Sequence, residues 1–222
     1  LQNSYLLHMT IYEYRQIIVP ASILIPIIIA VSRFQKMPAY AKCLLVYLVM
    51  SAIVNTTAII LALNHTPNLW LLHIYTILES FLLLYYFKLI IINKNANSFI
   101  RILLWAFPLF CVVNFLFLQS LYSFNTYARP VEAIIFITLC AEYWWHGNEE
   151  DSERSWGNIP NNWIVTGLML YFAGAFFLFL FAKYIMTGVA NKKAWDLVWD
   201  VNATLVLIMY LLMAVGFIKW KK

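Results

Sequence analysis

Ionisable side chains that interrupt long apolar stretches are the residues of this sequence best suited to chemistry. Glu79 lies in the middle of such a stretch, with Tyr75 one helical turn before it and His73 nearer the start. Arg129 and Glu132 are three residues apart and therefore share one face of a helix. Carboxylate, guanidinium, phenol and imidazole groups at these spacings can bind a ligand, carry a proton or pair with one another.

A second polar pattern runs along the last apolar stretch of the chain. Asp196, Asp200 and Thr204 recur at every fourth position, so they form a polar stripe on one helix face, and Asn202 lies beside it. Asn55 is an uncharged polar residue at a comparable depth in an earlier apolar stretch.

These polar residues predict either a binding pocket or a set of contacts between helices. A charge at the centre of a bilayer costs about 2.5–3.5 kcal/mol, so intramembrane ionisable residues need a partner or a wet cavity. The functional interpretation is a pocket that opens outward, with Glu79 at its floor and Glu132, Arg129 and Asp200 on its wall. The candidate ligand-binding residues are Glu79, Tyr75, His73, Glu132, Arg129, Asp200, Asn202 and Asn55.

The structural interpretation needs no ligand. Hydrogen bonds and salt bridges between helices, for instance from Arg129 to Asp200 or Glu132, would satisfy the same groups at about 0.6 kcal/mol each. A protonated Glu79 bonded to a neighbouring helix would satisfy the physics equally well. The residues alone leave both interpretations open.

Several chemistries are disfavoured by what the sequence lacks. A covalent retinal needs a lysine in the last helix, where Thr204 stands instead. A zinc-dependent hydrolase needs several converging histidines, but His73 and His146 lie toward opposite ends of their stretches. No serine or cysteine lies beside a histidine base, and no glycine-rich phosphate loop is present. We therefore predict no catalytic residue, no metal and no cofactor, and an enzyme is not favoured.

The elements that position these residues are predicted from composition. Of the 222 residues 64% are hydrophobic and 11% charged, and the mean hydropathy is +0.77, whereas a soluble domain carries about 25% charge. The apolar residues fall into blocks long enough to cross a hydrocarbon core of about 30 Å. We predict an all-α polytopic membrane protein, a single domain over 1–222 with seven transmembrane helices at approximately 15–33, 41–63, 69–92, 101–121, 128–146, 161–186 and 195–219.

The distribution of Lys and Arg predicts the orientation, because cytoplasmic loops carry an excess of both. An outside N-terminus and a cytoplasmic C-terminus in the bacterial inner membrane give ten basic residues inside, namely Arg33, Lys36, Lys42, Lys88, Lys94, Arg101, Arg154, Lys219, Lys221 and Lys222. Five then lie outside, namely Arg15, Arg129, Lys183, Lys192 and Lys193. The acidic cluster Glu149, Glu150, Asp151 and Glu153 would lie inside. Basic residues at the ends of apolar blocks indicate membrane lipids, and not nucleic acid, as partners.

Three short segments carry a resemblance to a known family. Residues 72–79 read LHIYTILE, residues 160–172 read PNNWIVTGLMLYF, and residues 212–217 read LMAVGF. The combination resembles uncharacterised seven-helix membrane domains of Bacteroidota that occur alone or ahead of cytoplasmic histidine-kinase modules. The resemblance implies a sensory role in which Tyr75, Glu79, Trp163, Gly167 and Tyr171 matter. The printed sequence contains no such output module.

Four functions compete at this point. The leading prediction is a membrane-embedded sensor or receptor-like module that signals through the C-terminal end of its last helix to a cytoplasmic partner. A small transporter or channel would use Glu79, Glu132 and Asp200 as an ion or proton path. The other two functions are a lipid-modifying enzyme and a scaffold subunit of a membrane complex. Besides a cytoplasmic signalling protein, a second copy of the chain is a candidate partner.

Overall fold

The described part of the chain consists of helices and their connections. The computed structural model describes residues 13–146, 155–186 and 192–220; for 181–186 and 192–194 it describes the helix without side chains. Among these residues no strand occurs, which confirms the all-α prediction. The helices are the first helix (η1 Tyr14–Ile18, α2 Val19–Ser22 and α3 Leu24–Ser32), α4 Ala39–Leu63, α5 Leu69–Ile90, α6 Lys94–Val113 with η3 Asn114–Leu118, α7 Ala128–His146, α8 Pro160–Met186 and α9 Lys192–Lys219. Short 3-10 turns, η2 Phe34–Lys36 and η5 Trp156–Asn158, lie in two connections.

Six of these helices are long and apolar enough to cross a membrane: the first helix, α4, α5, α6 with η3, α8 and α9. The remaining helix, α7, has 19 residues and carries Arg129, Glu132 and Glu142, which lower its mean hydropathy. It is nevertheless packed against α5 and α8, and its charges at positions 129 and 132 are buried. Two of the three residues that keep α7 from being a simple apolar span, Arg129 and Glu132, are therefore residues of the candidate site.

One helix boundary differs from its sequence-based range, and one helix changes its winding along its length. α6 begins at Lys94 instead of 101, because Asn93 caps the helix by accepting a hydrogen bond from Asn95 N at 3.0 Å, and the polar first turn is helical. The first helix changes its winding near Pro20, where Val19 N bonds to Tyr14 O and the preceding turn is a wider π turn. A proline ring clashes with the carbonyl four residues earlier, which accounts for the widening.

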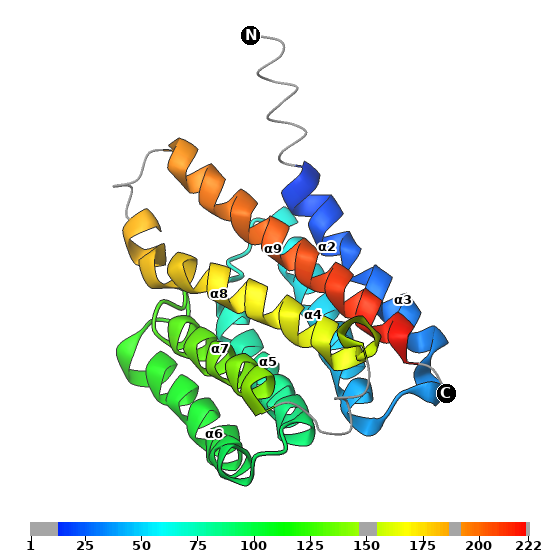
Figure 1. Ribbon diagram of the computed structural model, residues 1–222. Helices are drawn as coiled ribbons and strands as arrows, with labels where there is room; N and C mark the ends of the chain where they lie inside the picture. Colours follow the sequence, from blue (N-terminus) through cyan, green and yellow to red (C-terminus); the bar gives the residue numbers. More distant parts are fainter. Residues whose placement is uncertain (1–12, 147–154, 187–191, 221–222) are drawn as a thin grey trace.

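The helices form a closed ring with one helix outside it. In ring order the neighbours are the first helix, α9, α8, α7, α5 and α4, and α4 returns to the first helix. α6 packs on the outside against α5 and α7 (Figure 1). The core inside the ring is apolar and rich in aromatic rings, including Tyr86, Phe87, Phe136, Phe172 and Phe217.

The first helix and α9 run parallel and side by side. Arg15 pairs with Asp196 at one end, and Arg33 Nη1 donates to the carbonyl of Trp220 at 3.4 Å at the other. We call these the Arg15 end and the Trp220 end of the bundle. The first helix starts at the Arg15 end and α9 finishes at the Trp220 end, as an odd number of antiparallel passes requires (Figure 1).

The connection between α6 and α7 descends beside α5 before α7 begins. Ser123 O lies 3.1 Å from His73 Nε2, and Asn125 Nδ2 donates to Thr76 Oγ1 at 3.3 Å. Asn125 Oδ1 also accepts from Ala128 N at 3.2 Å and caps α7. Gln119 holds the same loop by donating to Phe124 O at 2.8 Å. Side chains thus satisfy non-helical backbone that would otherwise be costly to bury, and they set the depth at which Arg129 enters the bundle.

Candidate functional site

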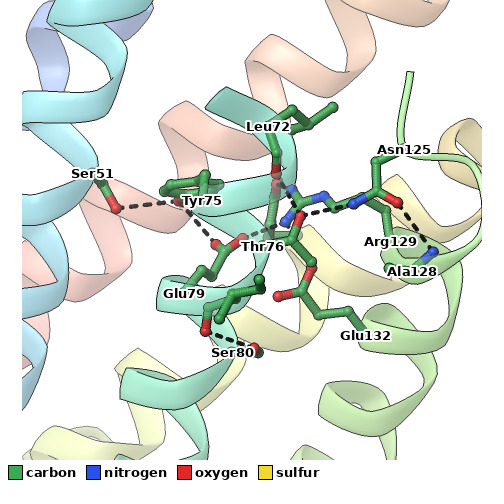
Figure 2. A network of polar contacts seen from close by, with 12 residues as sticks. Ser51, Leu72, Tyr75, Thr76, Glu79, Ser80, Asn125, Ala128, Arg129 and Glu132 are labelled. Atoms are coloured by element: carbon green, nitrogen blue, oxygen red, sulfur yellow. Dashed lines mark hydrogen bonds and ion pairs between the residues drawn. The ribbon is translucent and has the colours of Figure 1, made fainter. Parts of the chain in front are cut away.

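The centre of the bundle contains a buried cluster of one guanidinium and two carboxylates. Arg129 Nη1 donates to Glu79 Oε2 and, at 2.7 Å, to Glu132 Oε2. In Figure 2 the guanidinium reaches from α7 toward α5 and meets Glu79 there. Relative exposures of 3% for Arg129 and 0% for both carboxylates place all three out of solvent. Paired and hydrogen-bonded charges are the form in which ionisable groups tolerate such burial.

Tyrosine hydroxyls extend this cluster to two further helices. Tyr47 of α4 and Tyr75 of α5 both donate to Glu79 Oε1, at 3.1 and 3.0 Å. On the other side Arg129 Nη2 donates to the hydroxyl of Tyr171 on α8 at 2.9 Å. Ser51 Oγ lies 3.2 Å from the Tyr75 hydroxyl and adds a second link to α4. A single polar network therefore joins α4, α5, α7 and α8.

The cluster has an excess of one carboxylate and two unsatisfied atoms. One guanidinium faces two carboxylates, so the charges of the three groups, if all are ionised, sum to a net negative charge. Glu132 Oε1 and Arg129 Nε are buried without a hydrogen-bond partner. Unpaired buried polar atoms are rare in folded proteins and mark places where function or an additional bound group accounts for them.

A second cluster of the same composition lies at the Arg15 end. Arg15 Nη2 donates to Asp196 Oδ1 at 3.1 Å, and its Nε lies 3.2 Å from Asp200 Oδ1. Of the two partners suggested for Arg129, Asp200 pairs with Arg15 instead, because the first helix lies beside α9. The expectation that Arg129 pairs with Glu132 is correct, and Glu79, which has no charged neighbour in its own stretch, acquires one across the bundle.

Two adjoining cavities connect these clusters. The larger, of about 520 Å³, lies among the first helix, α4 and α9 and is lined by Arg15, Gln16, Val19, Pro20, Asn55, Trp195, Asp196, Trp199, Asn202, Ala203, Val206 and Tyr210. We call it the vestibule. The smaller, of about 320 Å³, is lined mostly by residues of α4, α5 and α9, among them Tyr47, Leu72 and Tyr75, and it also reaches Arg129 of α7 and Tyr171 of α8. We call it the inner cavity.

The two cavities share one wall. Asn202, Val206 and Tyr210 recur at every fourth position of α9 and line both, and Asn55 of α4 faces them. Volumes of about 300–1,000 Å³ are typical of small-molecule sites. The two cavities therefore adjoin, and together their linings extend from Arg15 to Arg129.

Some predicted site residues line this space and others do not. Asn55, Tyr75, Arg129 and Asn202 are lining residues. Glu79 and Glu132 line neither cavity; they lie fully buried and hold Arg129. His73 supports the α6–α7 connection, and Asp200 pairs with Arg15. Glu79 thus does not itself line the floor of the pocket, as the sequence suggested; Arg129, Tyr47 and Tyr75, which bond to its carboxylate, line the inner cavity instead.

Sequence reasoning missed four contributors. Tyr47 and Tyr210 each place a hydroxyl deep in an apolar stretch, which was the available signal. Arg15, which the sequence analysis treats as a topology residue, and Trp199, which it does not place in the site, both line the vestibule. Among the described residues no group of three or more His, Cys, Asp or Glu could hold a metal ion. The acidic cluster at Glu149–Glu153 and the basic residues at 221–222 lie outside the described residues.

The comparisons with known proteins do not place this geometry in a family. No family model, no curated protein and no solved structure matches the chain. The resemblance to seven-helix sensor domains stays a prediction, and the interpretation rests on the residues themselves.

Proposed function

We propose that this protein is a membrane-embedded, receptor-like sensor module with seven transmembrane helices. It binds a small molecule in the vestibule and inner cavity, with the Arg15 end and N-terminus outside and the C-terminus in the cytoplasm of a bacterial cell. The observation that carries the proposal is the convergence of a ligand-sized space on Arg129, whose partners come from α5, α7 and α8. A ligand that contacts Arg129 or its tyrosines alters contacts on several helices at once.

The packing of α8 against α9 supports a route for the signal. A Cβ on Gly167 would lie 3.2 Å from Met209 O, and one on Gly216 would lie 2.7 Å from Ile164 Cγ1. The two helices therefore approach closely near the cavity wall and again near the Trp220 end. Closely packed helices move as a pair, so displacement of the α9 wall is carried to the end where we place a cytoplasmic partner.

Cysteine labelling tests whether the space opens outward. Val206 lines both cavities, and Ile208, two residues further along α9, is exposed on the bundle surface and lines neither. Val206→Cys in intact spheroplasts should react with a membrane-impermeant thiol reagent. Ile208→Cys and the unaltered chain, with its own Cys43, Cys111 and Cys140, should remain unlabelled.

The same experiment separates the competing functions. Labelling of Val206→Cys from both membrane faces would contradict a sensor and favour a transporter or channel. Labelling only in inside-out vesicles would overturn the orientation. No labelling from either face, in a chain that folds, would contradict a water-accessible pocket and leave the scaffold alternative.

A further inference from the structure

The vestibule has the charge of a site for a cation. Among the described side chains that line the two cavities, the basic groups are Arg15 and Arg129. Each is already engaged by two carboxylates, Arg15 by Asp196 and Asp200, and Arg129 by Glu79 and Glu132. When these groups are ionised both clusters keep an excess of negative charge. An anionic ligand would have to displace a carboxylate, whereas a cation would complete the balance.

The free hydrogen-bonding atoms near the vestibule point to a ligand that donates. Asn202 Oδ1 and Asp200 Oδ1 are buried acceptors without a hydrogen-bond partner, although Asp200 Oδ1 lies within ion-pair distance of Arg15. Asn202 lines both cavities. Buried acceptors left unpaired cost about 1–3 kcal/mol each, so an N–H donor from a ligand is favoured there. Trp199 Nε1 is an unpartnered donor and could meet an acceptor elsewhere on the same ligand.

Aromatic rings supply the rest of the wall. Trp195 and Trp199 line the vestibule with their ring centroids 5.6 Å apart, and Tyr210 lies on the shared wall. The faces of tryptophan and tyrosine rings attract organic cations, and tryptophan does so most strongly. The vestibule thus combines the Asp196 carboxylate, the unpartnered Asn202 oxygen and tryptophan rings. This lining favours an organic cation over a bare metal ion, which would need several converging oxygen ligands.

We infer that the vestibule binds an organic ammonium ion, a primary or secondary amine on a small hydrocarbon frame. Its N–H groups are received by Asp196 and Asn202, and its charge lies against Trp195 and Trp199. This inference rests on the proposed function, because it assigns the ligand class of the same cavity.

The test compares three probes of one shape: benzylammonium, neutral benzyl alcohol and anionic benzoate. Thermal unfolding of the full chain in detergent is followed at increasing probe concentration, because a ligand of the folded state raises the melting temperature. Benzylammonium should raise it in a saturable manner, and the other two should not. Asp196→Asn should weaken benzylammonium binding about tenfold or more, the loss expected for one charge-assisted hydrogen bond.

Two further variants provide an independent test of the site and a control. Asn202→Leu removes the second acceptor and should weaken binding independently, so the inference stays testable if Asp196→Asn fails to fold. Glu142→Gln removes a carboxylate at the Trp220 end, where Glu142 pairs with His146 at 2.8 Å, and should leave binding unchanged.

The contrary outcomes are distinct. Saturable stabilisation by benzoate or benzyl alcohol, but not by benzylammonium, would overturn the ligand class. It would not affect the proposed function, which the labelling of Val206→Cys tests separately. Stabilisation by none of the three probes would overturn the inference for amines of this size. If the Asp196→Asn and Asn202→Leu variants both bound benzylammonium as tightly as the unaltered chain does, the amine would have to bind elsewhere.

Discussion

The hydroxyl of Tyr171 accepts a hydrogen bond of 2.9 Å from Arg129 Nη2, and this contact ties α8 to the ion pairs between α7 and α5. Arg129 thereby becomes the common partner of residues that lie up to 50 positions away in the chain. Its surroundings explain how a charged residue is retained in a helix of an otherwise apolar bundle. The ring of Phe179 also lies against it, with the guanidinium carbon 4.5 Å from the ring centroid.

The two carboxylates that hold Arg129 should differ in their contribution to stability. Glu79→Gln places an amide where Arg129, Tyr47 and Tyr75 all donate, so we expect a loss of about 3–5 kcal/mol in the free energy of unfolding. Glu132→Gln keeps one acceptor for Arg129 and removes the excess carboxylate, so its cost should be clearly smaller. Unfolding in detergent with a graded denaturant measures both, and equal costs would contradict the unequal roles assigned to them.

Tyr171→Phe should destabilise the protein by about 1–3 kcal/mol, because it leaves one Arg129 N–H buried without an acceptor. Tyr85→Phe provides the matched control, since Tyr85 is exposed on α5. The comparison of the two melting curves isolates the hydroxyl. A Tyr171→Phe variant as stable as the control would show that the contact is not needed to satisfy Arg129.

Asn125→Ala should weaken the attachment of the α6–α7 connection to α5 and to the start of α7. The amide bonds Thr76 and caps Ala128 N, and loss of a cap and a buried hydrogen bond should together cost about 1–3 kcal/mol. Hydrogen exchange of the first turn of α7 should accelerate, whereas Asn95→Ala, in the exposed first turn of α6, should leave it unchanged. Unaltered exchange in α7 would contradict the capping role.

Gly216→Ala should disturb the α8–α9 contact at the Trp220 end. The added Cβ would lie 2.7 Å from Ile164 Cγ1 and 3.0 Å from the backbone oxygen of Pro160, so one helix has to shift. Overpacking of this kind costs about 1–3 kcal/mol. Gly157→Ala, whose Cβ would have its nearest neighbour at 3.8 Å, should be neutral. Thermal unfolding of both variants provides the measurement, and equal melting temperatures would show that the helices are not closely packed there.

The sequence identified the residues of the site better than their partners. Glu79 is conspicuous because its apolar surroundings make a charge costly, and the spacing of Arg129 and Glu132 predicts that they share a helix face. Spacing reports on one helix only, whereas the choice between Asp200 and Glu79 as partner of Arg129 depends on which helices adjoin. The ring order, which brings the first helix to α9, assigns Asp200 to Arg15 instead.

Helix boundaries show the same limit. The ends of the apolar stretches closely matched most helices, but the start of α6 lay in a polar segment that hydropathy assigns to a break. Asn93 makes that segment helical through a cap, which is a local hydrogen bond and not a matter of hydropathy. The descending α6–α7 connection was not foreseen either, because its amide contacts to His73 and Thr76 are made across the bundle.

The side-by-side placement of the first helix and α9 has a consequence for biosynthesis. Arg15 emerges from the ribosome early, and its partner Asp196 is added 181 residues later. At about 5–20 residues per second, that interval lasts roughly 10–40 seconds. During this time the newly made first helix lacks the last neighbour that closes the ring. Completion of this bundle is therefore a closure event in which α9 docks against the first helix, and the vestibule between them is the last part of the bundle to acquire its walls.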